Sequence, residues 1–358
     1  MVTGNMQLQK LKNKKINLNN QKSKVISKHV SKFLQKTNQE HFVDIIPKRL
    51  LQNNCNKNSL LYLVDPSTAK DLTSIISPEL LQDHYSVIEC NPGLGLLTQE
   101  LLNIGIQHIT LLEKCVNFYN SNSPLYAIVL KYNTRLTLKY IPFNSFCLLS
   151  LRNKYLYQYD TEKSVISYSK YKRIAYIIPV ANKTSISLII YNFCNQTKLF
   201  DNRSIFYLIV SSSIWKDLYE NVEKTYTQFS KHYNRYYIIL KLFFNITLLG
   251  NLSRKAFLPW PNYDLNNCNI NDSDFLMVIK MEPKLQYLFT KIDLKHFWYF
   301  LRYCMRSKTT RVIVELEKLV PGCGMRLILN NMNMCTRFKD LNPNQLLTLF
   351  NEFKSWPE

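Results

Sequence analysis

The chain has 358 residues, 46% of them hydrophobic, and its 46 Lys and Arg against 25 Asp and Glu give a formal charge of +21. A chain of this length can bury one large core and a smaller satellite domain. The positive surplus favours a polyanionic partner, with nucleic acid as the leading candidate.

The cysteine pattern and the hydropathy argue against a metal-binding, a disulfide-rich and a membrane-spanning protein. The nine cysteines form no CxxC pair or Cys/His cluster, which argues against a metal site and a disulfide framework and favours a reducing compartment. The apolar stretch 236–249 is interrupted by Lys241 and Asn245. A bilayer crossing needs roughly 18 to 20 uncharged residues. We therefore expect no transmembrane helix and no membrane partner.

The first 48 residues are expected to be a basic leader. Nine lysines precede the first acidic residue, Glu40, as in an organelle-import segment, although arginine, which such segments usually prefer, is absent there. The alternative is a disordered, solvated basic arm, and both can hold at once. Residues 1–48 hold ten lysines and two acidic residues, so +13 of the formal charge remains on residues 49–358.

A βαβ unit is predicted next. Apolar positions within 59–77 have helical spacing behind Pro66, which can lie in the first turn. A short strand is expected at 85–88, a helix at 96–103 and a second strand at 109–112, with glycines between the first strand and the helix.

Further apolar or aromatic runs occur at 174–178, 205–210, 236–244 and 275–279, with a helix expected between them at 214–228. This alternation predicts an α/β sheet packed on both faces. After Pro283 the sequence consists of helix-period pieces, the last opening at Asn342-Pro343. We predict three parts: the leader 1–48, an α/β domain 49–286 and an all-helical domain 287–358.

The loop "ECNPGLGLLTQELL" is the candidate cofactor site. Glycine lets the backbone approach a ligand closely, and a helix N-terminus suits anionic or polar groups. Glu89 ends the first strand, and Glu113 ends the second, placed to accept both hydroxyls of a ribose. Both suit S-adenosylmethionine. The alternative is a tight βα turn with a surface glutamate at a strand end.

The same loop resembles the first motif of the rRNA adenine N6-dimethyltransferase family, Glu-x-Gly-Pro-Gly-x-Gly-x-Leu-Thr, with Asn91 where most members have glycine. "LVDPSTAKDL" at 63–72, "AFLPWPNYD" at 256–264, and "RSKTTRVI" with "LNPNQLLTLF" in the C-terminal part resemble other family segments in the same order. The Glu-Cys-Asn-Pro-Gly form is similar to the mitochondrial transcription factor B branch, in particular its second paralogue.

This resemblance implies a Rossmann-like class I S-adenosylmethionine-dependent methyltransferase sheet with a small helical C-terminal domain. It also implies the cofactor-binding positions Leu63, Glu89, Asn91, Gly93, Gly95 and Glu113.

The catalytic motif of the family is degraded. The family places Asn-[Ile/Leu]-Pro-[Tyr/Phe] at the end of the fourth strand, where this chain has Ile177, Ile178, Pro179 and Val180. Ile177 cannot accept a hydrogen bond from an adenine amine, and Val180 has no ring to stack on the base. We expect severely weakened methylation and name no confident catalytic residue.

A family aspartate that binds the cofactor adenine also lacks a counterpart. The 46 residues from Lys114 to Tyr159 contain no Asp or Glu. Backbone carbonyls, Asn133 or Asn144 are the alternative acceptors. S-adenosylmethionine is therefore expected as a vestigial cofactor, with no metal.

Aromatic and basic residues interleave at 168–176, 229–237 and 297–303, a mixture that can stack unpaired bases while cations follow phosphates. The alternative is core aromatics with solvated cations between them. The candidate nucleic-acid-binding residues are Lys170, Lys172, Arg173, Lys231, Arg235, Arg306 and Arg311.

The resemblance implies a transcription initiation factor of the mitochondrial matrix and nucleoid. Its partners would be mitochondrial RNA polymerase, promoter DNA and single-stranded nucleic acid, with mitochondrial rRNA as a further partner. The alternatives are an active dimethyltransferase of the mitochondrial small-subunit rRNA and a structural mitoribosome-assembly protein.

Overall fold

A computed structural model describes residues 28–52, 60–82, 85–153, 173–180, 183–197, 200, 204–223, 234–260, 275–284 and 291–356. Of the predicted site residues, Lys170, Lys172 and Lys231 lie outside the described residues.

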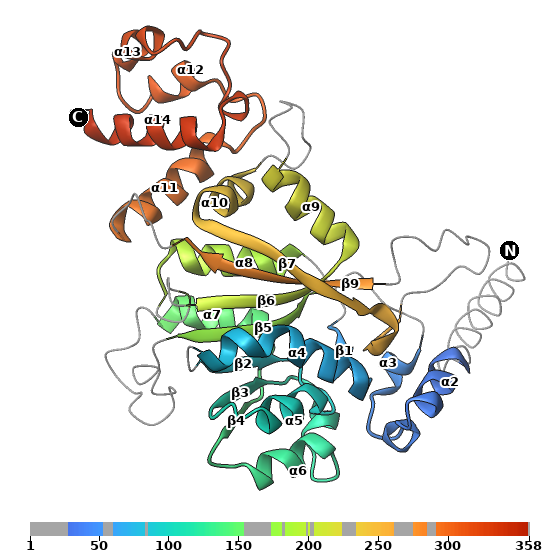
Figure 1. Cartoon of the computed structure of the whole chain (residues 1–358). Helices are drawn as coiled ribbons and strands as arrows, with labels where there is room; N and C mark the ends of the chain where they lie inside the picture. The colour runs from blue at the N-terminus through green and yellow to red at the C-terminus, as the bar shows by residue number, and fades with distance from the viewer. Residues whose placement is uncertain are drawn as a thin grey trace, which may run out of the picture.

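A seven-stranded sheet forms the centre of the molecule (Figure 1). In spatial order its strands are β4 (Leu136–Lys139), β3 (Ile109–Leu112), β2 (Ser86–Cys90), β5 (Ile174–Val180), β6 (Ser204–Ser211), β9 (Phe275–Pro283) and β7 (Phe244–Ser253). The first five are parallel, and β9 is antiparallel to both β6 and β7. The predicted α/β class is therefore confirmed.

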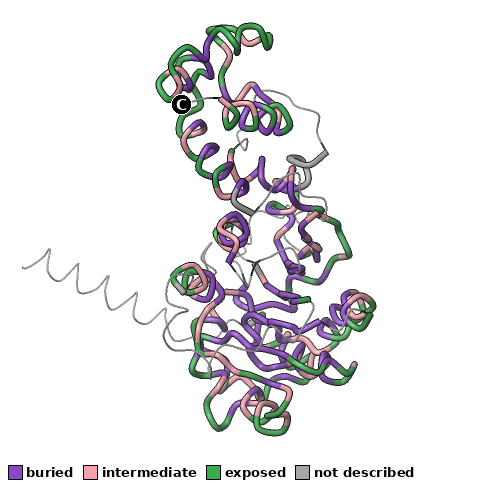
Figure 2. The backbone as a smooth tube through the Cα atoms, turned by 90° about the vertical axis from the view of Figure 1, so that its left-hand side faces the viewer, coloured by how far each residue is buried: buried purple, intermediate pink, exposed green. Residues whose placement is uncertain are grey.

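Alternation along the strands divides the core into two layers. In β5, Ala175 and Ile177 face one hydrophobic cluster, whereas Tyr176 and Ile178 face the other. The first cluster is covered by α4 (Pro66–Gln82), α5 (Leu96–Asn103) and α6 (Pro124–Lys131). The second is covered by α7 (Phe143–Asn153), α8 (Lys183–Cys194), α9 (Ser212–Glu223) and α10 (Arg235–Phe243). Because both faces are covered, β2, β3 and β6 are buried almost throughout, whereas the edge strands β4 and β7 are partly exposed (Figure 2).

Most predicted elements lie where the sequence placed them. The helix at 96–103 and the strand at 109–112 have the predicted bounds, and Pro66 opens α4. The interpretation of the apolar run 236–244 as a strand is wrong, because residues 235–243 form α10 and β7 begins only at Phe244. The Asn234 side chain caps α10 by accepting the backbone N–H groups of Tyr236 and Tyr237 at 2.9 and 3.1 Å.

Part of the predicted leader packs on the α/β domain. Residues 28–52 contain α2 (Lys28–Lys36), η1 (Glu40–Phe42) and α3 (Lys48–Leu51). Val30 and Leu34 on α2 are fully buried, and the Phe33 ring packs edge-on against Trp260. The expectation of a solvated arm therefore does not describe residues 28–48.

A small two-stranded sheet joins this region to the loop after β7. β1 (Tyr62–Leu63) pairs with β8 (Phe257–Leu258), which follows η4 (Arg254–Ala256). The buried guanidinium of Arg254 donates to the carbonyls of Phe257 and Pro259, the latter at 2.6 Å. These bonds fix the turn that presents β8 to β1.

The C-terminal residues are helical. They form α11 (Lys291–Cys304), α12 (Val312–Leu316), α13 (Cys323–Leu329), η5 (Phe338–Asp340) and α14 (Pro343–Ser355), which extend beyond the sheet in Figure 1. As predicted, α14 opens at Asn342-Pro343, where Asn342 and Gln345 form a reciprocal capping box. Of the helices described, none is long and apolar enough to cross a membrane.

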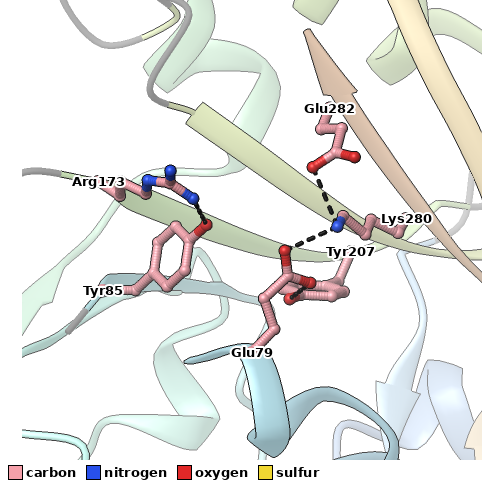
Figure 3. Close-up of polar contacts among 6 residues, drawn as sticks. All are labelled: Glu79, Tyr85, Arg173, Tyr207, Lys280 and Glu282. Carbon is pink, nitrogen blue, oxygen red and sulfur yellow. Dashed lines mark hydrogen bonds and ion pairs between the residues drawn. The ribbon is translucent and has the colours of Figure 1, made fainter. Parts of the chain in front are cut away.

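A polar cluster fastens α4 to the sheet (Figure 3). The Glu79 carboxylate accepts from the Tyr207 hydroxyl at 2.9 Å and from Lys280 Nζ at 2.7 Å, and Lys280 also pairs with Glu282 at 3.0 Å. Burial opposes the charge on Lys280, but the two carboxylates outweigh it and raise its pKa.

Candidate functional site

The glycine loop leads from β2 into α5 at the carboxyl edge of the parallel strands. Asn91, Gly93 and Gly95 have φ angles of 55°, 58° and 78°, in the left-handed region. The Asn91 N–H donates to the Leu112 carbonyl at 3.0 Å, which joins the loop to the neighbouring strand. This path through the left-handed region explains why the chain uses scarce glycines here.

Both glycines of the motif lie against the chain's own side chains. A Cβ at Gly93 would stand 3.1 Å from Cδ1 of Tyr62, and one at Gly95 would stand 2.9 Å from Cδ1 of Ile128. The sequence predicted that the backbone of these glycines approaches a ligand closely. The structure shows that it closely approaches Tyr62 of β1 and Ile128 of α6.

Glu113 is completely buried just after β3. Its Oε2 accepts from the Gly93 N–H at 3.2 Å, and its Oε1 accepts from the Cys115 N–H at 2.7 Å and the Tyr62 hydroxyl at 3.4 Å. Burial raises the pKa of this carboxyl to about 7, against the lowering effect of these donors. The predicted ribose-binding carboxylate therefore holds the loop and β1 together.

Glu89 is the second buried carboxyl. The Thr98 hydroxyl on α5 donates to its Oε2 at 2.7 Å. Burial raises the pKa of Glu89 to about 8, and the charge of Glu113 adds to the rise. Close by in the chain, Asn91 Oδ1 is buried and has no hydrogen-bond partner among the described residues, which makes it an acceptor that suits a ligand donor.

These side chains fit part of S-adenosylmethionine, the cofactor that the resemblance implies. Asn91 Oδ1 and Glu89 are acceptors suited to an ammonium group, and Glu113 is an acceptor suited to ribose hydroxyls. The end of β4, at Lys139, carries no acidic residue. In the part of the chain that the structure describes, no group of three or more His, Cys, Asp or Glu is arranged to hold a metal ion.

The degraded motif lies beside this site. Ile177 is fully buried and pairs in register with Glu89. Ile178 is buried in the opposite hydrophobic cluster, and Pro179 is half-buried. Val180 ends β5, and its side chain is outside the described part. Position 177 thus contributes an apolar side chain to the core and no acceptor.

A cavity of about 110 Å³ lies between α8, α9 and α10. Its apolar wall includes Ile186 and Leu218, and its polar lining includes Tyr236 and the ion pair of Lys183 with Asp217. Since α8 starts three residues after Val180, the cavity lies close to the degraded motif along the chain.

The described basic candidates do not form one cluster through direct contacts. Arg173 precedes β5, at the strand end opposite to the glycine loop, and donates to the Tyr85 hydroxyl at 3.2 Å (Figure 3). Arg306 pairs with Glu315 at 2.8 Å, and Arg311 is exposed before α12.

The Arg235 side chain lies against two aromatic rings, of which that of Trp298 is buried in the core. Its guanidinium lies 5.1 Å from the ring centre of Tyr236 and 5.2 Å from that of Trp298. Within the part of the chain that the structure describes, the buried Arg235 Nε and Trp298 Nε1 have no acceptor. Arg235 and Trp298 lie in two of the predicted aromatic and basic stretches, 229–237 and 297–303, but the sequence does not predict that they contact each other.

Two residues near the loop have positions that the sequence did not predict. Leu63, a predicted cofactor contact, is buried in β1 opposite Phe257. Its neighbour Tyr62, which was not predicted, contacts the loop and Glu113. The bond joins residues 51 positions apart, and no local spacing signals it.

Comparison with known proteins supports the resemblance. The family model for ribosomal RNA adenine dimethylase matches residues 156–355. The chain is 23% identical to mitochondrial dimethyladenosine transferase 2 of Drosophila melanogaster over 366 aligned positions, covering 87% of this chain and 79% of that protein. Ribosomal RNA small subunit methyltransferase A of Anaplasma phagocytophilum is 34% identical over 64 residues, 18% of this chain and 23% of that protein.

Among solved structures, a dimethyladenosine transferase from Plasmodium falciparum aligns with a TM-score of 0.47 and 17% identity, covering 82% of this chain and 98% of that one. The family model covers more than half of the chain. The chain belongs to the ribosomal RNA adenine dimethylase family.

Proposed function

We propose that the chain is a mitochondrial transcription initiation factor that works with mitochondrial RNA polymerase to melt promoter DNA and stabilise the open complex. The observation that carries this proposal is Ile177, an apolar core side chain where the family places its adenine acceptor. A family member without that acceptor keeps a nucleic-acid-binding fold but loses a group that orients the target amine.

Charge and stacking groups support nucleic-acid binding. Residues 49–358 keep a formal charge of +13, which attracts phosphates over long range. Arg235, beside the half-buried ring of Tyr236, offers a cation and an aromatic ring together. Such groups bind unpaired bases with little sequence preference, as a factor that holds melted DNA requires.

The relative in Drosophila melanogaster is named as a mitochondrial protein, which supports a mitochondrial location for this chain. The resemblance to the transcription factor B branch supports the matrix and its nucleoids, where promoter DNA and the polymerase are found.

Run-off transcription tests the proposal. The cognate mitochondrial RNA polymerase is assayed on a linear duplex promoter and on the same promoter with a pre-melted start site. We expect the chain to stimulate the duplex template strongly and the pre-melted template weakly. Efficient dimethylation of small-subunit rRNA without stimulation of the duplex template would refute it.

A second candidate function is dimethylation of the mitochondrial small-subunit rRNA. The unpaired Asn91 Oδ1 and the buried carboxyls Glu89 and Glu113 favour it, because these groups fit the ammonium and ribose of S-adenosylmethionine. The cofactor would supply an electrophilic methyl group. This candidate predicts methyl transfer to rRNA adenines at a rate that Glu113→Gln lowers.

A further inference from the structure

We propose that Tyr62 is an internal occupant of the ribose subsite, whose hydroxyl competes with a bound nucleoside for the Glu113 carboxylate. The role of Tyr62 concerns the cofactor site alone and holds whether or not the chain acts in transcription. It would make Tyr62 the residue that sets the affinity for S-adenosyl cofactors.

The Tyr62 side chain is buried beside the glycine loop. The side chain is 2% exposed, and its ring lies against Gly93 and 4.9 Å from the ring centre of Phe118. Its backbone pairs with Leu258 across the β1–β8 sheet. The ring therefore packs on the glycine loop and holds its hydroxyl at the Glu113 carboxylate.

The hydrogen bonds of Glu113 show where competition occurs. Two donors, the N–H groups of Gly93 and Cys115, belong to the backbone beside the carboxylate. Among the described residues, the Tyr62 hydroxyl is the side-chain donor to Glu113, and its distance of 3.4 Å is the longest of the three. It can leave without disturbing the backbone around the carboxylate.

A ribose brings two vicinal hydroxyls, and each needs an acceptor when it is buried. The carboxylate oxygens already accept from backbone N–H groups and from the Tyr62 hydroxyl, and Oε1 holds both the Cys115 N–H and the Tyr62 hydroxyl. A ribose hydroxyl that bonds to Oε1 therefore replaces the phenol. Binding then includes the loss of one internal hydrogen bond.

Tyr62→Phe separates the hydroxyl from the ring. The variant keeps the aromatic packing on Gly93 and Phe118 and removes only the competing donor. Because one net hydrogen bond changes an equilibrium by about three- to tenfold, we expect S-adenosylhomocysteine to bind the variant about three- to tenfold more tightly than the wild-type chain.

Isothermal titration calorimetry of the full chain with S-adenosylhomocysteine measures this directly. Tyr119→Phe is the matched control, since Tyr119 lies beside Phe118 in the chain but its ring packs on Tyr140, at 4.4 Å. Circular dichroism melting verifies that each variant is folded. Glu113→Gln should abolish the gain when it is combined with Tyr62→Phe.

Tighter binding by Tyr62→Phe, with Tyr119→Phe unchanged, supports the proposal. Unchanged or weaker binding by folded Tyr62→Phe overturns it, since a phenol that helps to hold the ribose gives that result. The absence of detectable binding by Tyr62→Phe also overturns it. None of these results bears on promoter melting, so the transcription function is tested separately.

Discussion

Glu89→Gln is expected to remove the contribution of Glu89 to the pH dependence of stability above pH 5 and to leave that of Glu113. Burial raises the pKa of Glu89 from about 4.5 to about 8 in the folded protein. Between these values the unfolded chain releases a proton that the folded chain retains. The contribution of Glu89 to the free energy of unfolding is therefore fully present below pH 4.5 and is lost as the pH rises through 8.

The size of the effect follows from the difference between the two pKa values. Each unit corresponds to about 1.4 kcal/mol, so the contribution of Glu89 declines by on the order of 4 kcal/mol between pH 4.5 and 8. Glutamine keeps an oxygen that can accept from the Thr98 hydroxyl and has no proton to release. We expect the variant to gain stability relative to the wild-type chain as the pH rises.

Urea unfolding at pH 5.5, 7.0 and 8.5 checks this expectation. The difference between Glu89→Gln and wild type should grow by about 3 kcal/mol in favour of the variant. Glu100→Gln, on the half-exposed side of α5, is the control and should track the wild type. A difference that stays constant across the three pH values would refute the assignment of a buried, protonated carboxyl at position 89.

Four further variants test other parts of the structure. Gly95→Ala should lower the free energy of unfolding by about 3 kcal/mol, because of its left-handed backbone and the 2.9 Å approach of the new Cβ to Ile128. Gly105→Ala should lower it by about 1 kcal/mol in the same urea assay, because φ is +96° but no described atom lies within 4 Å of the Cβ position. Arg254→Met should lower the free energy of unfolding by about 3 kcal/mol, because it leaves the two carbonyls without their donor; unchanged stability would contradict this role. Arg235→Gln should weaken binding to single-stranded DNA about tenfold and reduce its salt dependence, as measured by fluorescence anisotropy, and equal affinity at all salt concentrations would rule out contact there.

Local signals were sufficient for the elements around the glycine loop. The helix at 96–103 and the strand at 109–112 follow from apolar period and from the glycines that end or precede them. The run 236–244 could not be assigned in this way. Residues 237–240 are all buried, and a continuous apolar run fits a buried helix and a buried strand equally.

Two features, the packing of α2 and the contact of Tyr62 with Glu113, depend on long-range contacts and could not be predicted from the sequence. Val30 and Leu34 are four residues apart on one face of α2, but the lysines around them dominate the composition of the leader. Tyr62 reaches Glu113 from β1, which pairs with β8 from a distant part of the chain. The candidate loop could therefore be predicted from sequence, whereas the side chain that fills it could not.

The opening of promoter DNA tests the proposed function most directly. A duplex promoter labelled with 2-aminopurine at the start site is mixed with cognate mitochondrial RNA polymerase, with and without the chain, in the absence of S-adenosylmethionine. We predict that fluorescence rises only when the chain is present, because melting needs its nucleic-acid-binding surface and no methyl donor. Equal fluorescence with and without the chain, or a rise that requires S-adenosylmethionine, would contradict a role in promoter melting.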